Sequence, residues 1–192
     1  ISPLPDDFRV MRGYSVSQLL VDWICNQFGT APQKRDGTMM MFSDNVIKYQ
    51  IVRRDDFDVA GFIPSEWKNE INAAAKLLDA TDPDLSAFAS HGGKLIMLHG
   101  TADQLVAIRG TTDYYLALRE FFGEKKLDSF VRYYIVPGYG HGNGSVFTMG
   151  RDLLRDIDDW VTKGRAPETI EVTDQNEATY GRKQTLEPYR RN

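Results

Sequence analysis

Short apolar runs alternate with amphipathic helical patterns in the second half of the chain. Residues 94–98 and 130–136 are runs of strand length with glycine or proline at a boundary, and their apolar character is typical of strands buried on both faces. Apolar positions at helical spacing predict helices over residues 65–78, 111–122 and 149–163. Helix and strand therefore alternate, an order that favours an α/β fold with a parallel sheet.

The predicted helices carry recognisable signals at their ends. Ser65 can cap the first helix, Asp82-Pro83 stops it, and Gly164 ends the last one. The apolar face of the first helix consists of Trp67, Ile71, Ala74, Ala75 and Leu78.

The first 60 residues are less regular. Residues 16–28 form an apolar, helix-like stretch, whereas residues 39–42 and 46–52 have β character. The charged residues 53–56 indicate a solvated turn. At the other end of the chain, residues 166–192 are polar, and we expect them to wrap the surface of a domain core over residues 61–165.

Composition excludes some classes of partner. The 192 residues carry a net charge of −4, and the isoelectric point near 5.4 argues against a nucleic-acid surface, which needs a concentrated basic face. No apolar run approaches ~18 residues, so we expect no membrane partner. Cys25 is the single cysteine and cannot form an intrachain disulfide. Since the sequence begins Ile1-Ser2-Pro3, without Met or signal-peptide features, we expect a processed or truncated chain.

Two titratable residues follow the two predicted strands at equal distances. Asp103 lies five residues after Leu98, and His141 lies five residues after Val136. Ligands of open α/β sheets bind beyond the carboxyl ends of the strands, so we expect both side chains at one sheet edge. There a carboxylate can orient an imidazole that acts as general base toward a nucleophile. The order Asp then His also matches that of α/β-hydrolases.

Each residue alone has a simpler interpretation. An isolated Asp in such a loop usually caps a helix, and an isolated His in a glycine-rich loop is usually a surface turn residue. The nucleophile is absent from this sequence, because no serine lies in a Gly-x-Ser-x-Gly elbow. Ser145 follows glycines but precedes a predicted helix, and we interpret it as a helix N-cap.

The positions of the other two histidines indicate structural roles. We interpret His99, at the end of the first predicted strand, as a packed residue that orients the Asp103 loop, and His91 as a turn residue. His91, His99 and Asp103 lack any recognised ligand spacing, so we expect no metal site from them.

Several longer blocks resemble the tannase and feruloyl esterase family. They run in family order over about half the chain and comprise residues 80–88, 92–103, 110–115, 136–141 and 159–167. The resemblance implies a secreted or periplasmic serine esterase of the α/β-hydrolase fold that cleaves phenolic-acid esters such as galloyl or feruloyl esters. It also implies that Asp103 is the triad acid and His141 the triad base. Residues 1–60 then become the end of an inserted lid domain, which commonly carries a structural calcium ion.

The sequence departs from this family in its cysteines. Members typically have a cysteine directly after the histidine, in a disulfide with one before the serine, whereas Gly142 stands here. Glu187 likewise precedes Pro188-Tyr189, where the family often has cysteine. The disulfide brace that is typical of the family is therefore missing from this part of the protein.

The leading hypothesis is the C-terminal half of a serine esterase, with the serine supplied by the N-terminal half of the same protein and a small ester as substrate. No cofactor is expected in this chain, and we expect the chain alone to be inactive. Lid aromatic residues Phe42, Tyr49 and Trp67 are candidates for the acyl pocket, with ordinary packing as the alternative for each. The competing hypothesis is a non-catalytic binding or scaffold protein built on a hydrolase remnant.

Overall fold

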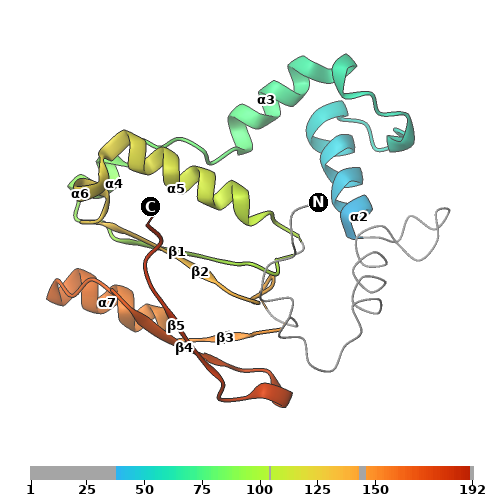
Figure 1. The fold of residues 1–192 in the computed structure, drawn as a ribbon. Coiled ribbons are helices and arrows are strands. Elements are labelled where there is room, and N and C mark those ends of the chain that lie inside the picture. Colours follow the sequence, from blue (N-terminus) through green and yellow to red (C-terminus); the bar gives the residue numbers. More distant parts are fainter. Residues whose placement is uncertain (1–37, 104, 143–145, 191–192) are drawn as a thin grey trace. The chain divides into compact units, whose positions relative to one another are not determined.

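A computed structural model describes residues 38–103, 105–142 and 146–190. These residues belong to two compact units, one containing residues 38–81 and the other residues 82–190 (Figure 1). The predicted helix over residues 16–28, Cys25 and Ser145 lie outside the described residues. The boundary falls between Thr81 and Asp82, and the assignment of residues 1–60 to a lid stays a prediction.

The first unit is helical where the sequence predicts β character. Residues 39–42 lie in helix α2 (Thr38–Asn45), and residues 46–52 form a π-helical turn, η2 (Val46–Val52). The β prediction for both runs is therefore wrong. The neighbouring side chains of Ile51 and Val52 are both buried, whereas successive residues of a strand point to opposite faces. Short apolar runs rich in β-branched residues do not distinguish a strand from a buried helical segment.

The helix predicted over residues 65–78 begins differently from the prediction. Short 3₁₀ turns η3 (Val59–Gly61) and η4 (Pro64–Trp67) precede helix α3 (Lys68–Leu78). Ser65 lies inside η4, and no side chain caps α3, so the capping role of Ser65 is wrong. Trp67 instead packs against Phe57 and Phe62, with ring centroids 5.9 and 6.5 Å away. Trp67 is thus accounted for by ordinary packing, while Phe42 and Tyr49 are exposed.

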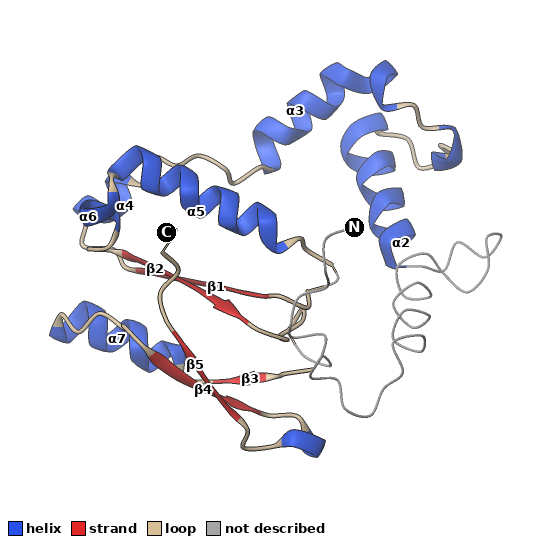
Figure 2. Cartoon of the chain, viewed as in Figure 1, coloured by secondary structure: helices blue, strands red, loops and turns tan. Residues whose placement is uncertain are grey.

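The second unit is built on two parallel strands, β1 (Leu95–Gly100) and β2 (Val131–Val136). Leu95 pairs with Val131 and Gly100 with Val136, which confirms the predicted parallel pairing. Helix α4 (Ser86–Ser90) precedes β1. Helix α5 (Ile108–Phe122) and the short helix α6 (Glu124–Leu127) connect the two strands, so the βαβ order is as predicted (Figure 2).

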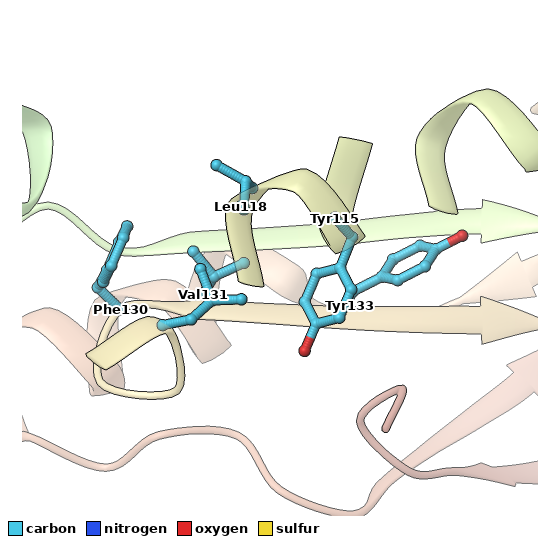
Figure 3. Packing of buried hydrophobic residues seen from close by; sticks show 6 residues of the cluster. Tyr115, Leu118, Phe130, Val131 and Tyr133 are labelled. Carbon is cyan, nitrogen blue, oxygen red and sulfur yellow. The ribbon is translucent and has the colours of Figure 1, made fainter. Parts of the chain in front are cut away.

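The two faces of β2 contact different partners because its side chains alternate. On one face, Val131 and Tyr133 pack with Tyr115 and Leu118 of α5, as Figure 3 shows. On the other, Tyr134 and Val136 pack against residues that follow the strand: Phe147, Ile170, Val172 and Leu186. Burial on both faces explains the near-continuous apolar character of this strand.

The polar C-terminal segment contributes to this core. Strand β3 (Met149–Gly150), β4 (Ile170–Asp174) and β5 (Lys183–Leu186) form an antiparallel sheet, with the 3₁₀ turn η5 (Glu177–Thr179) between β4 and β5. Alternate residues Ile170, Val172 and Asp174 are buried. The expectation of a segment that only wraps the surface therefore misses two strands, because their polar outer faces mask a one-sided pattern.

Helix α7 (Leu153–Lys163) is shorter than predicted because β3 occupies its expected start. Asp152 caps the helix by accepting a hydrogen bond from the Arg155 N–H at 3.0 Å. Gly164 adopts a left-handed conformation with φ 66°, which confirms the predicted stop. Trp160 of α7 packs under the Arg132 guanidinium, 5.1 Å from the ring centroid.

Candidate active site

The register of the parallel strands brings the loops after β1 and β2 together. Because Gly100 pairs with Val136, both strands end at the same edge of the sheet. The Ala102 N–H donates to the Tyr139 carbonyl at 3.0 Å, and the Gly138 N–H donates to Thr101 Oγ1 at 2.9 Å. A side chain at position 100 would place its Cβ 1.8 Å from the Tyr139 carbonyl oxygen. The close approach of the two loops therefore requires glycine there.

Asp103 and His141 meet between these loops. Oδ2 of Asp103 lies 2.9 Å from Nδ1 of His141, within hydrogen-bond distance. The Asp103 side chain is 7% exposed and the His141 side chain 49% exposed. The carboxylate is thus enclosed while the imidazole reaches solvent. With Nδ1 facing the carboxylate, Nε2 is the ring nitrogen left to exchange a proton with another group.

The second carboxylate oxygen of Asp103 is held by the backbone. Oδ1 accepts hydrogen bonds from the N–H groups of Leu105 at 2.9 Å and Val106 at 2.8 Å. Burial alone raises the pKa of Asp103, but the Val106 N–H, the His141 ring and the Leu105 N–H outweigh it and lower this pKa below its ordinary value. Asp103 therefore stays ionised beside the imidazole at neutral pH.

Hydrogen bonds from the antiparallel sheet hold the chain that follows His141. Asp174 is fully buried and its Oδ1 accepts from the Thr148 N–H at 3.0 Å. Its Oδ2 pairs with Arg182 at 2.7 Å, and the same guanidinium donates to the Val146 carbonyl at 2.6 Å. Sequence reasoning missed Asp174 and Arg182, since both lie in the polar segment and no motif marks them.

His99 is packed, as predicted from its place at the end of the strand. Its side chain is 9% exposed and lies beside the Asp103 loop. His91 lies at the end of α4, with Nδ1 2.7 Å from the Ala87 carbonyl oxygen. Within the described ranges, no group of three or more His, Cys, Asp or Glu side chains is placed to hold a metal ion. No calcium ligand is therefore assigned, and calcium in a lid stays a prediction.

No helix within the described part of the chain combines the length and apolar character that crossing a bilayer requires.

Several known proteins are similar to this sequence over most of its length. An uncharacterized esterase of Agrobacterium fabrum is 30% identical over 88% of this chain and 32% of its own length. Mono(2-hydroxyethyl) terephthalate hydrolase of Piscinibacter sakaiensis is 30% identical over 83% of this chain and 24% of its own length. A probable feruloyl esterase B-2 of Aspergillus terreus is 29% identical, over 73% and 30% respectively. The chain thus spans a third or less of the length of these relatives.

Solved structures and a family model agree with these relatives. Feruloyl esterase B from Aspergillus oryzae has a TM-score of 0.65 at 21% identity, over 76% of this chain and 32% of that one. Tannin acyl hydrolase from Aspergillus niger has a TM-score of 0.64 at 21% identity, over 80% and 31%. Both structures share the fold of this chain. The family model for tannase and feruloyl esterase matches residues 9–191, and the chain belongs to the tannase and feruloyl esterase family.

Proposed function

We propose that this chain is part of a serine-type carboxylic ester hydrolase in which His141 is the general base and Asp103 its orienting acid. The observation that carries the proposal is the 2.9 Å contact between Asp103 Oδ2 and His141 Nδ1, made by an enclosed carboxylate and a half-exposed ring. Membership of an esterase family supports the same reading.

The geometry suits acyl transfer. Asp103 holds the ring with its proton on Nδ1, so Nε2 takes the proton of a serine hydroxyl as that oxygen attacks the ester carbonyl. The carboxylate then stabilises the imidazolium, which returns the proton to the leaving alcohol. Backbone N–H groups elsewhere in the full protein would bind the oxyanion.

We place the serine in a segment of the full protein that precedes Ile1, in the N-terminal half of an α/β-hydrolase core. Two of the relatives are about three times as long as their matched parts, and this sequence has no Gly-x-Ser-x-Gly elbow. On this proposal, residues 1–60 end an inserted lid domain that carries the calcium ion, and the protein is secreted or periplasmic.

For the substrate we propose an ester of an aromatic acid. The names of two relatives specify feruloyl and terephthalate esters, and both acyl groups are aromatic. The exposed side chains of Phe42 and Tyr49 are available for stacking on such a ring in the full protein.

The test is hydrolysis of p-nitrophenyl acetate and methyl gallate by the full-length protein. We expect His141→Ala to lower kcat by ~10⁴-fold or more, as loss of a triad member does. His91→Ala is the matched control, since Nδ1 of His91 lies 2.7 Å from the Ala87 carbonyl oxygen of the preceding helix, and it should retain wild-type turnover. Unchanged turnover in His141→Ala would rule out His141 as the general base.

The missing elbow also supports a second candidate, a non-catalytic binding protein built on a hydrolase remnant. The upstream coding sequence separates the two candidates. A Gly-x-Ser-x-Gly elbow there supports the esterase, and a gene without one rejects it in favour of the remnant.

A further inference from the structure

A second imidazole lies against the Asp103 carboxylate. Nε2 of His99, in β1, lies 3.3 Å from Asp103 Oδ2 and 3.1 Å from the Val106 carbonyl oxygen. Both neighbours are acceptors without a proton to give. Nε2 therefore carries the ring hydrogen, because a bare lone pair there would face two oxygen atoms.

The other ring nitrogen of His99 has a partner that suits this tautomer. Nδ1 lies 2.7 Å from Oγ1 of Thr111, near the start of α5. The Thr111 hydroxyl can donate its hydrogen to Nδ1, which leaves the hydrogen of the neutral ring on Nε2. Strand β1 and helix α5 thus orient the ring from two sides, and the ring is almost fully enclosed.

Both oxygens of Asp103 consequently have polar neighbours from more than one segment. The backbone N–H groups of Leu105 and Val106 hold Oδ1, and the rings of His99 and His141 flank Oδ2. The Nε2–H of His99 donates to the Val106 carbonyl oxygen at 3.1 Å, and the Val106 N–H in turn donates to Asp103 Oδ1 at 2.8 Å. His99 therefore bears on both oxygens of Asp103, on Oδ2 by direct contact and on Oδ1 through the Val106 backbone.

We propose that His99 is a positioning residue for the Asp103–His141 pair, with Thr111 fixing its tautomer. The proposal deepens the proposed function and rests on it for its effect on turnover. His99 keeps the carboxylate aligned as His141 gains and loses its proton, and it touches no substrate atom.

The first test uses this chain and needs no activity. The sequence has three histidines, so long-range ¹H–¹⁵N NMR spectra resolve the tautomer of each ring. In the wild-type chain we expect His99 with hydrogen on Nε2 and His141 with hydrogen on Nδ1. His99→Leu should raise the fraction of His141 in the other tautomer severalfold. His99→Gln places an amide N–H where Nε2 was and should retain the wild-type His141 tautomer, as should the control His91→Gln.

A second variant keeps the test decisive if His99→Leu does not fold. Thr111→Val preserves the shape of the side chain and removes only the hydroxyl that donates to Nδ1, so we expect the minor His99 form with hydrogen on Nδ1 to increase measurably while the Nε2 form stays dominant. His99 unchanged in Thr111→Val, or His141 unchanged in a folded His99→Leu chain, overturns the proposal.

The second test measures turnover in the full-length protein. His99→Asn, whose amide reaches only the Nδ1 position, should lower kcat about tenfold with KM unchanged, well short of the ~10⁴-fold cost of a wrong tautomer in serine hydrolases. His99→Gln should stay within about threefold of wild type. Equal losses in both variants, or a change in KM alone, contradict positioning. If the full-length protein lacks esterase activity, the proposed function fails, while the NMR test still decides the role of His99.

Discussion

The Asp103 carboxylate makes contacts that a helix-capping carboxylate does not make. Its Oδ1 binds two backbone N–H groups, as in a simple capping turn, but its Oδ2 faces two imidazole rings. The lowered pKa of Asp103 means that the stability contributed by its ionised form is present above the ordinary Asp pKa and is lost as pH falls through the native value. Acidification therefore weakens the Asp103 loop and the His141 contact together.

The absence of a side chain at Gly100 allows the two loops to approach closely, so we expect a substitution there to disturb them. Gly100→Ala places a Cβ 1.8 Å from the Tyr139 carbonyl oxygen, so the backbone must move. We expect a loss of about 2–3 kcal/mol in the free energy of unfolding, measured by urea denaturation, and a weaker Asp103–His141 contact by NMR.

Gly110 offers the matched control for this substitution. It lies in α5, and a Cβ there would meet nothing within 4 Å. Gly110→Ala should raise the free energy of unfolding by about 0.5–1 kcal/mol. Equal stabilities of the two alanine variants would show that the loops do not pack as described.

At the scale of elements, two sheets share the placement of His141. The loop that contains His141 begins at the end of strand β2. After this loop, Val146 and Thr148 are held by hydrogen bonds with Arg182 and Asp174. Asp174 links these parts. Burial raises the pKa of Asp174, but hydrogen bonds from Thr148, Thr179 and Asn176 and the Arg182 guanidinium together lower it below the ordinary value.

Asp174→Asn tests that link. The variant keeps the size of the side chain but leaves the part-buried Arg182 guanidinium without its charge partner, and we expect a loss of about 3 kcal/mol near neutral pH. Because the native pKa of Asp174 is lowered, its contribution is full above the ordinary Asp pKa and disappears as pH falls through the native value. Urea unfolding of both proteins over an acid pH series should show their stabilities converging.

Glu171→Gln is the control on the same strand, since the Glu171–Lys183 pair is exposed. Its effect should stay within about 0.5 kcal/mol. A stability difference for Asp174→Asn that persists at low pH would assign the loss to packing instead of charge.

At the scale of the whole molecule, the proposed function makes this chain the source of a base and its orienter for a larger protein. Its described parallel sheet has two strands, and the matched relatives are about three times as long as the part that this chain covers. Both facts agree with a site completed by segments beyond this sequence.

We therefore expect the purified 192-residue chain to show no turnover of p-nitrophenyl acetate above the buffer rate. The comparison is with full-length protein at equal concentration, before and after a serine-directed inhibitor. Robust turnover by the chain alone, abolished by that inhibitor, would place a nucleophile within these residues and refute the division proposed here.

Local patterns were enough to predict much of the second unit. The run that became β2 is apolar because both of its faces are buried, and the apolar residues of β1 are partly buried on both faces. The helical periods of α5 and α7 are visible without any partner. Asp103 and His141 could be selected because each follows a parallel strand at the same distance, and parallel strands in register end at one edge. The distance of 2.9 Å between them came from the structure.

Tertiary contacts decided the features that no local pattern encodes. Residues 46–52 have β-branched composition, yet packing within their own unit makes them helical. Strands β4 and β5 read as a polar tail because only one face of each is buried. Asp174 binds Thr148, which lies 26 residues earlier in the sequence, and His99 in β1 contacts Thr111 in α5. Periodicity reports which face of an element is buried, whereas the partner that buries it depends on the folded arrangement of distant segments.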